Sequence, residues 1–194
     1  MDLLFEAKKS NKDAFNKLIE NYRHIYYKIT RMFFHDEYNV KLVIEKTLHF
    51  LYKNLVEVKN SDNFLVWSIE NLISTARAEQ KKLKDSKYNV DGLKSLSSGI
   101  AFEKRVVSSI SSQEHEEYEL YRSQSIVEEY LTSIKEELRL PALLYYYANL
   151  KEHEIVKVTG LSAQTVENYI NEARIKLFEI IENKEVDLYY DKRY

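Results

Sequence analysis

One segment near the carboxyl-terminal end carries polar residues whose types and spacing suit contact with DNA bases. Its apolar positions, a turn at Gly160 and a cap at Ser162 give Glu152–Leu177 the pattern of a helix-turn-helix. Asn and Gln side chains can form paired hydrogen bonds with adenine, and the second helix of this motif lies in the major groove. The residues predicted to face the groove are Ala163, Gln164, Thr165, Glu167, Asn168 and Asn171.

The charge of this segment opposes DNA binding by the chain alone. Four acidic residues stand against three basic ones between Glu152 and Lys176, and the whole chain has a formal net charge of −2. Because phosphate contacts supply most of the affinity of an autonomous DNA-binding protein, we expect a partner to hold the phosphates. The alternative interpretation is a helical hairpin with a glycine turn that touches no nucleic acid.

A second region with suitable side chains begins at residue 59. Residues 59–63 form a predicted turn whose polar side chains can contact an unpaired strand, namely Lys59, Asn60, Ser61 and Asn63. The helix predicted over about 62–84 ends in the basic residues Arg77, Lys81, Lys82 and Lys84. A solvated turn, and a basic end that only complements the helix dipole, are the alternatives.

Phe64 and Trp67 lie three residues apart on one face of this predicted helix. Aromatic side chains in such an arrangement can stack on unpaired bases or pack in a hydrophobic core. We predict core packing for both, because the apolar side of the helix continues through Leu72 and Ala76.

No group of residues has the spacing required for catalysis or metal binding. The five histidines are scattered, the chain has no cysteine, and its three glycines form no phosphate-binding loop. No pair of carboxylates stands in an apolar setting that would suit acid–base chemistry. We therefore expect no enzymatic activity, metal, cofactor or small-molecule substrate.

The sequence also lacks segments that direct a chain into or across a membrane. Its first residues, MDLLFEAKKSNKDAF, do not show the basic and apolar regions of a secretory signal. No uncharged apolar run approaches the roughly 20 residues of a membrane span. We expect a cytoplasmic protein without membrane insertion.

The composition and the apolar periodicity predict an all-α fold. Hydrophobic residues make up 44% of the chain, while one proline and three glycines leave few turn-forming residues. Apolar stripes at helical spacing cover Phe15–Phe33 and Val40–Leu55. A cap at Ser10 or Asn11 is predicted before the first stripe, and a polar loop at His35–Asn39 between the two.

Serine-rich pieces with weak periodicity separate the two well-patterned regions, which predicts two small helical domains joined by a flexible linker. Pro141 is predicted in the first turn of a helix over 142–150. A short helix near 152–159 and a longer one from Ala163 to about Asn183 follow. The predicted domains are 1–85 and 121–183, with the linker at 86–120 and a tail at 184–194.

The carboxyl-terminal domain resembles the promoter −35 recognition domain of sigma-70 family transcription factors. The family pattern is a Leu-Pro pair before an apolar and aromatic helix, then the helix-turn-helix, then an Ala-Arg-x-x-Leu ending. This chain matches it at Leu140–Pro141, Gly160, Ser162, Thr165–Val166 and Ala173–Arg174 with Leu177. The resemblance adds Arg174 to the predicted DNA-binding residues. Glu167 stands where the family often has a basic residue.

The amino-terminal domain resembles the family's other main domain, which binds the polymerase clamp and opens the promoter −10 element. Phe64-x-x-Trp67 followed by Ser74–Thr75–Ala76–Arg77 resembles its −10-reading helix, and Ala14–Phe15 with Leu18 and Tyr22 resembles its first helix. By this resemblance Ser74 and the basic residues after it contact promoter DNA. The helix between these two segments of the sequence is implied to bind polymerase through Leu42, Glu45, Lys46 and His49. The family usually has carboxylates where Leu42 and Lys46 stand.

The two resemblances cover both predicted domains in the family's order. They imply an extracytoplasmic-function (ECF) sigma factor that directs core RNA polymerase to promoters, captures the −10 strand and recognises the −35 element. The implied partners are core RNA polymerase, promoter DNA and an anti-sigma factor. Two other functions stay open: an autonomous helix-turn-helix transcriptional regulator, and a degenerate sigma-like protein that binds polymerase without reading promoters.

Overall fold

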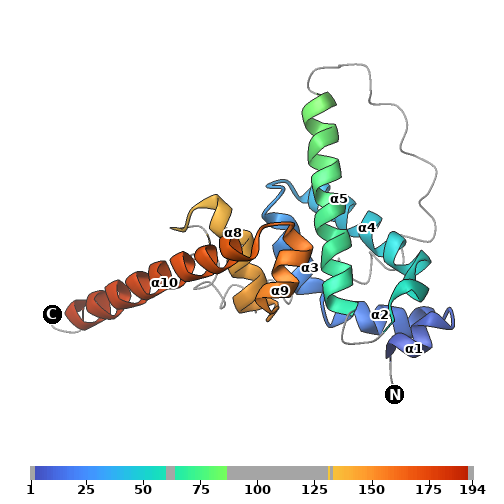
Figure 1. The fold of residues 1–194 in the computed structure, drawn as a ribbon, viewed down its shortest axis with the longest axis horizontal. Helices are drawn as coiled ribbons and strands as arrows, with labels where there is room; N and C mark the ends of the chain where they lie inside the picture. Colours follow the sequence, from blue (N-terminus) through green and yellow to red (C-terminus); the bar gives the residue numbers. More distant parts are fainter. Residues whose placement is uncertain (1–2, 60–63, 87–130, 132, 192–194) are drawn as a thin grey trace. The chain divides into compact units, whose positions relative to one another are not determined.

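The computed structural model describes residues 3–59, 64–86, 131 and 133–191, with side chains up to residue 179 in the last helix. Every regular element in these ranges is helical, which confirms the predicted all-α fold (Figure 1). The chain divides into two compact units, residues 1–117 and 118–194. None of the helices in the described ranges is long and apolar enough to span a membrane.

The first unit is built around one long helix. In chain order its described helices are α1 Leu3–Lys8, α2 Lys12–Glu20, α3 Arg23–Arg31, α4 Glu37–Lys53, the 3₁₀ helix η1 Leu55–Glu57, and α5 Phe64–Ser86. Helices α3 and α4 pack against α5, and α1 packs against α2 and η1 (Figure 1). The fully buried side chains of this core include Ile19, Ile29, Leu51, Ile69, Leu72 and Ile73.

A side-chain cap fixes the start of α2. Asn11 Oδ1 accepts a hydrogen bond from Ala14 N at 3.1 Å, so the predicted cap is at Asn11. Ser10, the other residue predicted for this role, precedes it with a positive φ of 65°. The apolar stripe predicted over 15–33 falls on two helices, α2 and α3, with a turn between them.

Helix α4 begins earlier than the sequence predicted. Asp36 Oδ1 accepts a hydrogen bond from Asn39 N at 2.8 Å and caps a helix that starts at Glu37. The loop predicted at His35–Asn39 is therefore wrong for its last three residues. The physical reason is the aspartate, whose side chain supplies an acceptor to the first helical turn.

Phe64 and Trp67 have different environments at the start of α5. Phe64 exposes 1% of its surface, and its ring centroid lies 5.9 Å from that of Tyr22 and 6.1 Å from that of Trp67. Trp67 is half-buried and also faces Phe50, with 6.5 Å between the ring centroids. Phe64 thus packs in the core as predicted, while Trp67 lies at the core's margin.

One buried polar contact joins α3 to α5. The Tyr26 hydroxyl donates a hydrogen bond to Ser68 Oγ at 2.7 Å, and Ser68 donates to the Leu65 carbonyl at 2.8 Å. Burial raises the pKa of Tyr26 well above its ordinary value, so the hydroxyl stays protonated and able to donate. This bond fixes the position of α3 along the long helix.

The second unit contains four described helical segments: α8 Glu136–Ala142, the π-helical η3 Leu143–Tyr147, α9 Glu152–Thr159 and α10 Ala163–Asp191. The two helices predicted around the glycine turn are confirmed. Helix α10 runs on to Asp191, so its predicted end near Asn183 is wrong and most of the predicted tail is helical. Both α8 and α9 pack against α10.

Pro141 lies near the end of a helix and not in the first turn of one. Helix α8 starts at Glu136 and contains Pro141, so the helix predicted over 142–150 is helical as predicted over 142–147 but wrong in its start and in its last three residues. Proline has no backbone N–H to donate to the preceding turn. The chain widens directly after it into the π-helical segment, and Ala148 N donates to the Leu143 carbonyl at 3.1 Å.

Three predicted parts of the chain lie wholly or largely outside the described residues. They are the linker at 86–120, positions 60–63 of the polar turn, and the start of the second domain before Leu131. They stay predictions.

Gly160 ends α9 in the left-handed region, with a φ of 73°. A Cβ added there meets no atom within 4 Å, so only the backbone strain of a non-glycine residue opposes substitution.

We expect Gly160→Ala to lower the free energy of unfolding of the second unit by about 1 kcal/mol, measured by urea denaturation. Asn149→Gly, at a φ of 53°, is the matched control and should leave stability unchanged or slightly raised. A loss above about 3 kcal/mol for Gly160→Ala would contradict this, since it requires a packing defect.

Candidate nucleic-acid interface

The corner between α9 and α10 has the geometry of a helix-turn-helix. Ser162 Oγ accepts a hydrogen bond from Thr165 N at 3.1 Å, which confirms the predicted cap of α10. The turn itself is the left-handed Gly160. Of the apolar positions on which the predicted motif rests, Ile155, Val158, Val166, Ile170 and Ala173 are buried, while Tyr169, also predicted to face the core, is half-buried.

The outer side of α10 carries the residues predicted to face DNA. Six of them are exposed and Thr165 is half-buried; the set, here called the recognition face, is Ala163, Gln164, Thr165, Glu167, Asn168, Asn171 and Arg174. Gln164 Nε2 donates to Asn168 Oδ1 at 3.1 Å, which holds the two amides side by side. Amides in this position present donors and acceptors of the kind that pair with the adenine edge in the major groove.

Internal contacts engage three of the four acidic residues that make the charge of this segment unfavourable, among them Glu167, whose Oε2 accepts a hydrogen bond from Gln164 Nε2 at 3.5 Å. Glu154 Oε2 accepts a hydrogen bond from Lys151 N at 2.8 Å at the start of α9. Glu172 Oε1 pairs with Lys135 Nζ at 2.9 Å. Glu167 belongs to the recognition face itself, where a carboxylate repels phosphate and can accept from the cytosine amino group.

Arg174 is held by a tyrosine that the sequence did not single out. Its Nε donates to the Tyr146 hydroxyl at 3.4 Å. Tyr146 lies in η3 and packs edge-on against Tyr145, with 4.9 Å between the ring centroids. The contact joins η3 to α10 and positions the guanidinium at the end of the recognition face.

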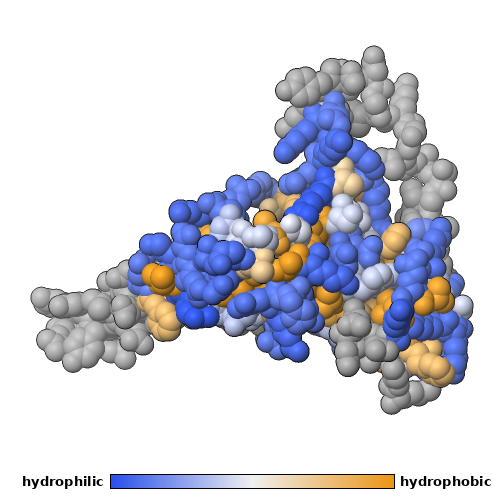
Figure 2. Space-filling model, viewed as in Figure 1, coloured by the Kyte–Doolittle hydropathy of each residue, from blue (hydrophilic) through white to orange (hydrophobic). Residues whose placement is uncertain are grey.

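The exposed side of α5 carries a row of residues predicted to contact promoter DNA. Ser74, Arg77, Lys81 and Lys84, here called the basic stripe, fall within roughly 80° of the helix circumference at about 100° per residue, and all four are exposed. In the view of Figure 2 the surface over the end of α5 is hydrophilic. Lys82, predicted to act with them, points to another side of the helix and pairs with Glu79 at 2.7 Å.

Only the first residue of the turn predicted to hold an unpaired base is described. Lys59 is exposed, while the preceding Val58 is buried. The Val58 carbonyl accepts a hydrogen bond from Lys8 Nζ, so α1 anchors the chain just before the turn. Asn60, Ser61 and Asn63 lie outside the described residues.

The residues predicted to bind polymerase share one side of α4. They are spaced three and four apart along the helix, which aligns them on one face, and each is half-buried: Leu42, Glu45, Lys46 and His49. We call this set the α4 face. Lys46 Nζ lies 2.9 Å from Glu79 Oε2 on α5, so one of the four already has an ionic partner inside the unit.

Comparison with known proteins finds a solved structure with a similar fold, while the comparisons of sequence find no match. No family model matches the chain, and no curated protein matches it. Among solved structures it is similar to CnrH, an ECF sigma factor whose structure was determined in complex with the cytosolic domain of CnrY. The match covers 93% of this chain and 96% of that one, with a TM-score of 0.56 and 19% sequence identity. The fold is ECF sigma-like.

This similarity takes in nearly the whole of both chains. At 19% identity it establishes the architecture alone, and the roles of individual residues stay predictions. In the described ranges, no group of three or more histidine, aspartate or glutamate side chains is arranged to hold a metal ion.

The sequence analysis missed two residues in these sites, Glu79 and Tyr146. The spacing of Glu79 and Lys82, three apart on a helix, is a signal that could have indicated their ion pair. Nothing in the spacing indicates the pairs that join different helices, Glu79 with Lys46 and Tyr146 with Arg174. Those contacts depend on how the helices pack.

Proposed function

We propose that this chain is a sigma factor that directs core RNA polymerase to specific promoters. The observation that carries the proposal is the ECF sigma-like fold across both units, combined with an exposed polar recognition face on a helix-turn-helix. The formal net charge of −2 supports a subunit role, because an autonomous DNA-binding protein usually carries a basic excess.

In this proposal the second unit recognises the −35 element. The start of α10 lies in the major groove, where the paired amides of Gln164 and Asn168 contact base edges. Arg174, held by Tyr146, contacts the phosphate backbone farther along the helix. Polymerase supplies the additional phosphate contacts that the near-neutral unit lacks.

The first unit opens the −10 element. The basic stripe on α5 contacts promoter phosphates, and the turn that follows Val58 holds an unpaired base through Lys59 and the polar side chains after it. Unstacking a base costs a few kcal/mol, which contacts to the flipped base and the backbone offset. No nucleotide hydrolysis by this chain is needed.

Two protein partners belong to this function. Core RNA polymerase binds the α4 face, which lies on the side of α4 opposite the core residues Val43 and Thr47. An anti-sigma protein is proposed as the second partner, because the similar protein CnrH was solved in complex with the cytosolic domain of CnrY.

A degenerate sigma-like protein that binds polymerase without reading promoters is the second candidate function. The observation that favours it is the state of Lys46, whose ammonium is engaged by Glu79. Glu167 on the recognition face points the same way, because its carboxylate repels phosphate. Promoter-dependent binding by the complex with core polymerase separates the two functions.

We expect Gln164→Ala combined with Asn168→Ala to weaken promoter binding by the polymerase complex about 10- to 100-fold, because a paired base contact is worth about 1–3 kcal/mol. The measurement is fluorescence anisotropy with labelled promoter DNA, core polymerase and each variant. The remaining affinity should no longer respond to base changes in the −35 element.

Lys176→Ala combined with Glu179→Ala is the matched control, since it removes an exposed ion pair farther along α10. It should leave promoter binding within about twofold of the wild type. If the Gln164 and Asn168 variant still discriminates between −35 sequences as the wild type does, the recognition face is misassigned.

A further inference from the structure

A nearly buried carboxylate joins the two functional helices of the first unit. Glu79 exposes 9% of its surface, on the inward side of α5. Its Oε1 lies 2.7 Å from Lys82 Nζ on the same helix, and its Oε2 lies 2.9 Å from Lys46 Nζ on α4. Each carboxylate oxygen thus holds one lysine, and the two lysines come from the two helices proposed to bind different partners.

The electrostatics of this cluster favour a charged glutamate. Burial alone raises the pKa of the Glu79 carboxyl, but hydrogen bonds from Lys82 and Lys46, together with their charges, outweigh it and lower the pKa. The carboxylate is therefore ionised at neutral pH. Without it, two ammonium groups are left close together at the junction of α4 and α5.

A second contact fixes the neighbouring residue of the same helix. Gln80 Nε2 donates a hydrogen bond to the Phe33 carbonyl at 2.8 Å, in the segment between α3 and α4. The part of α5 just before Lys81 is therefore tied to two places in the unit. The last turns of the helix, which carry Lys81 and Lys84, extend from this anchored point.

We propose that Glu79 is a positioning residue that couples the α4 face to the basic stripe. Its carboxylate holds Lys46 and Lys82 in one cluster, so that docking of α4 on polymerase sets the position of the DNA-contacting end of α5. This proposal rests on the proposed sigma-factor function. It goes beyond that function in assigning a role to a residue that touches neither polymerase nor DNA.

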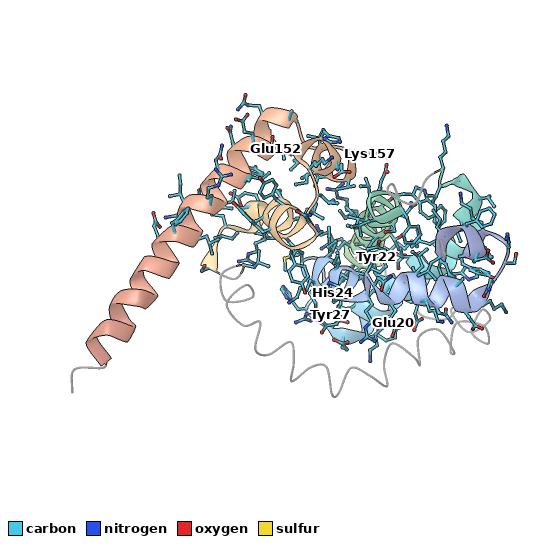
Figure 3. The ribbon with its side chains drawn as sticks, turned by 90° about the horizontal axis from the view of Figure 1, so that it is seen from below. Glu20, Tyr22, His24, Tyr27, Glu152 and Lys157 are labelled. Atoms are coloured by element: carbon cyan, nitrogen blue, oxygen red, sulfur yellow. The ribbon has the colours of Figure 1, made fainter. Side chains whose placement is uncertain are left out.

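The test separates core binding from promoter opening. Glu79→Gln keeps the shape of the side chain and removes its charge. Glu20→Gln, an exposed carboxylate on α2 (Figure 3), is the matched control for the loss of one negative charge. For each variant, the dissociation constant for core polymerase and the rate of promoter opening at saturating polymerase are measured, the second with a fluorescent base in the −10 element.

We expect Glu79→Gln to slow promoter opening about tenfold, the size of a typical coupling between sites, with core affinity close to that of Glu20→Gln, when rates are compared at a temperature at which both variants are folded. Lys46→Gln should slow opening at saturating polymerase by a similar factor, and the double variant should open no more slowly than Glu79→Gln, because both changes break the same ion pair. The two effects would multiply if Glu79 and Lys46 acted independently.

Two results would overturn the inference while the sigma-factor function stands: opening rates for Glu79→Gln equal to those of Glu20→Gln, or a double variant that is slowed by the product of the two single effects. If Glu79→Gln fails to fold, Lys46→Gln breaks the same pair from α4, and normal opening at saturating polymerase would then refute the coupling. Failure of the wild-type protein to bind core polymerase would instead refute the proposed function.

Discussion

Reversing the charges of Lys81 and Lys84 together should reduce promoter opening roughly 100-fold while core polymerase binding stays intact. Both side chains are exposed on the basic stripe of α5. Each reversal removes a phosphate contact and places a carboxylate against DNA, and we expect a combined cost of about 3 kcal/mol. The logarithm of affinity should also fall less steeply with salt, by a slope of roughly 2, because two phosphate contacts are lost.

Lys82 is left out of this variant because Glu79 holds it, and a carboxylate at that position would repel Glu79 directly. The control is Lys12→Glu combined with Lys17→Glu, which makes the same change of charge on exposed positions of α2. Open-complex formation is followed by permanganate footprinting over a range of salt concentrations. Equal effects of the two double variants would show that overall charge matters and that the stripe does not.

The second large effect is expected in the core of the first unit. Phe64→Ala should lower the free energy of unfolding of that unit by about 3–5 kcal/mol, the usual cost of removing a buried aromatic ring. Phe64 exposes 1% of its surface and packs between Tyr22 and Trp67. Urea denaturation measures the loss, and Phe5→Ala, which removes a ring that is 58% exposed, should change stability far less.

This variant also tests the choice between packing and base stacking. If Phe64 stacks on an unpaired base, Phe64→Ala will fold with nearly normal stability and lose only promoter opening. If Phe64 packs in the core, Phe64→Ala will lower the stability of the first unit, and every activity of that unit will fall because less of the protein is folded. The buried position predicts the second result.

The sequence predicted those features that depend on local chemistry. The helix-turn-helix could be read directly, because Gly160 takes a left-handed backbone and Ser162 caps the next helix, both within a few residues. The all-α fold followed from helical periodicity and the near absence of turn-forming residues. The recognition face followed in turn, since burial of Val166 and Ile170 fixes which side of α10 is exposed.

The errors arose where a residue has more than one local use. Pro141 suits the first turn of a helix, but it also fits near the end of one when the next turn is wide, as in η3. Asp36 was placed inside a polar loop, although aspartate is also a strong helix cap. The local sequence pattern allows both positions for each residue, and the packing of the neighbouring helices determines which one the residue takes.

Contacts between helices could not be predicted at all. The pair of Glu79 with Lys46 requires α4 and α5 to pack side by side in one register, and that register depends on the whole core. The sequence therefore named Lys46 as a polymerase contact and Lys82 as a DNA contact without indicating that one carboxylate holds both.

Run-off transcription with purified core polymerase tests the central claim most directly. The template is a library of genomic promoter fragments, transcribed with core enzyme alone and with core enzyme plus this protein. We predict new start sites that appear only with the protein and share one sequence element near −10 and another near −35. Transcripts identical in both reactions, from a protein that is folded by denaturation analysis, would contradict the assignment as a sigma factor.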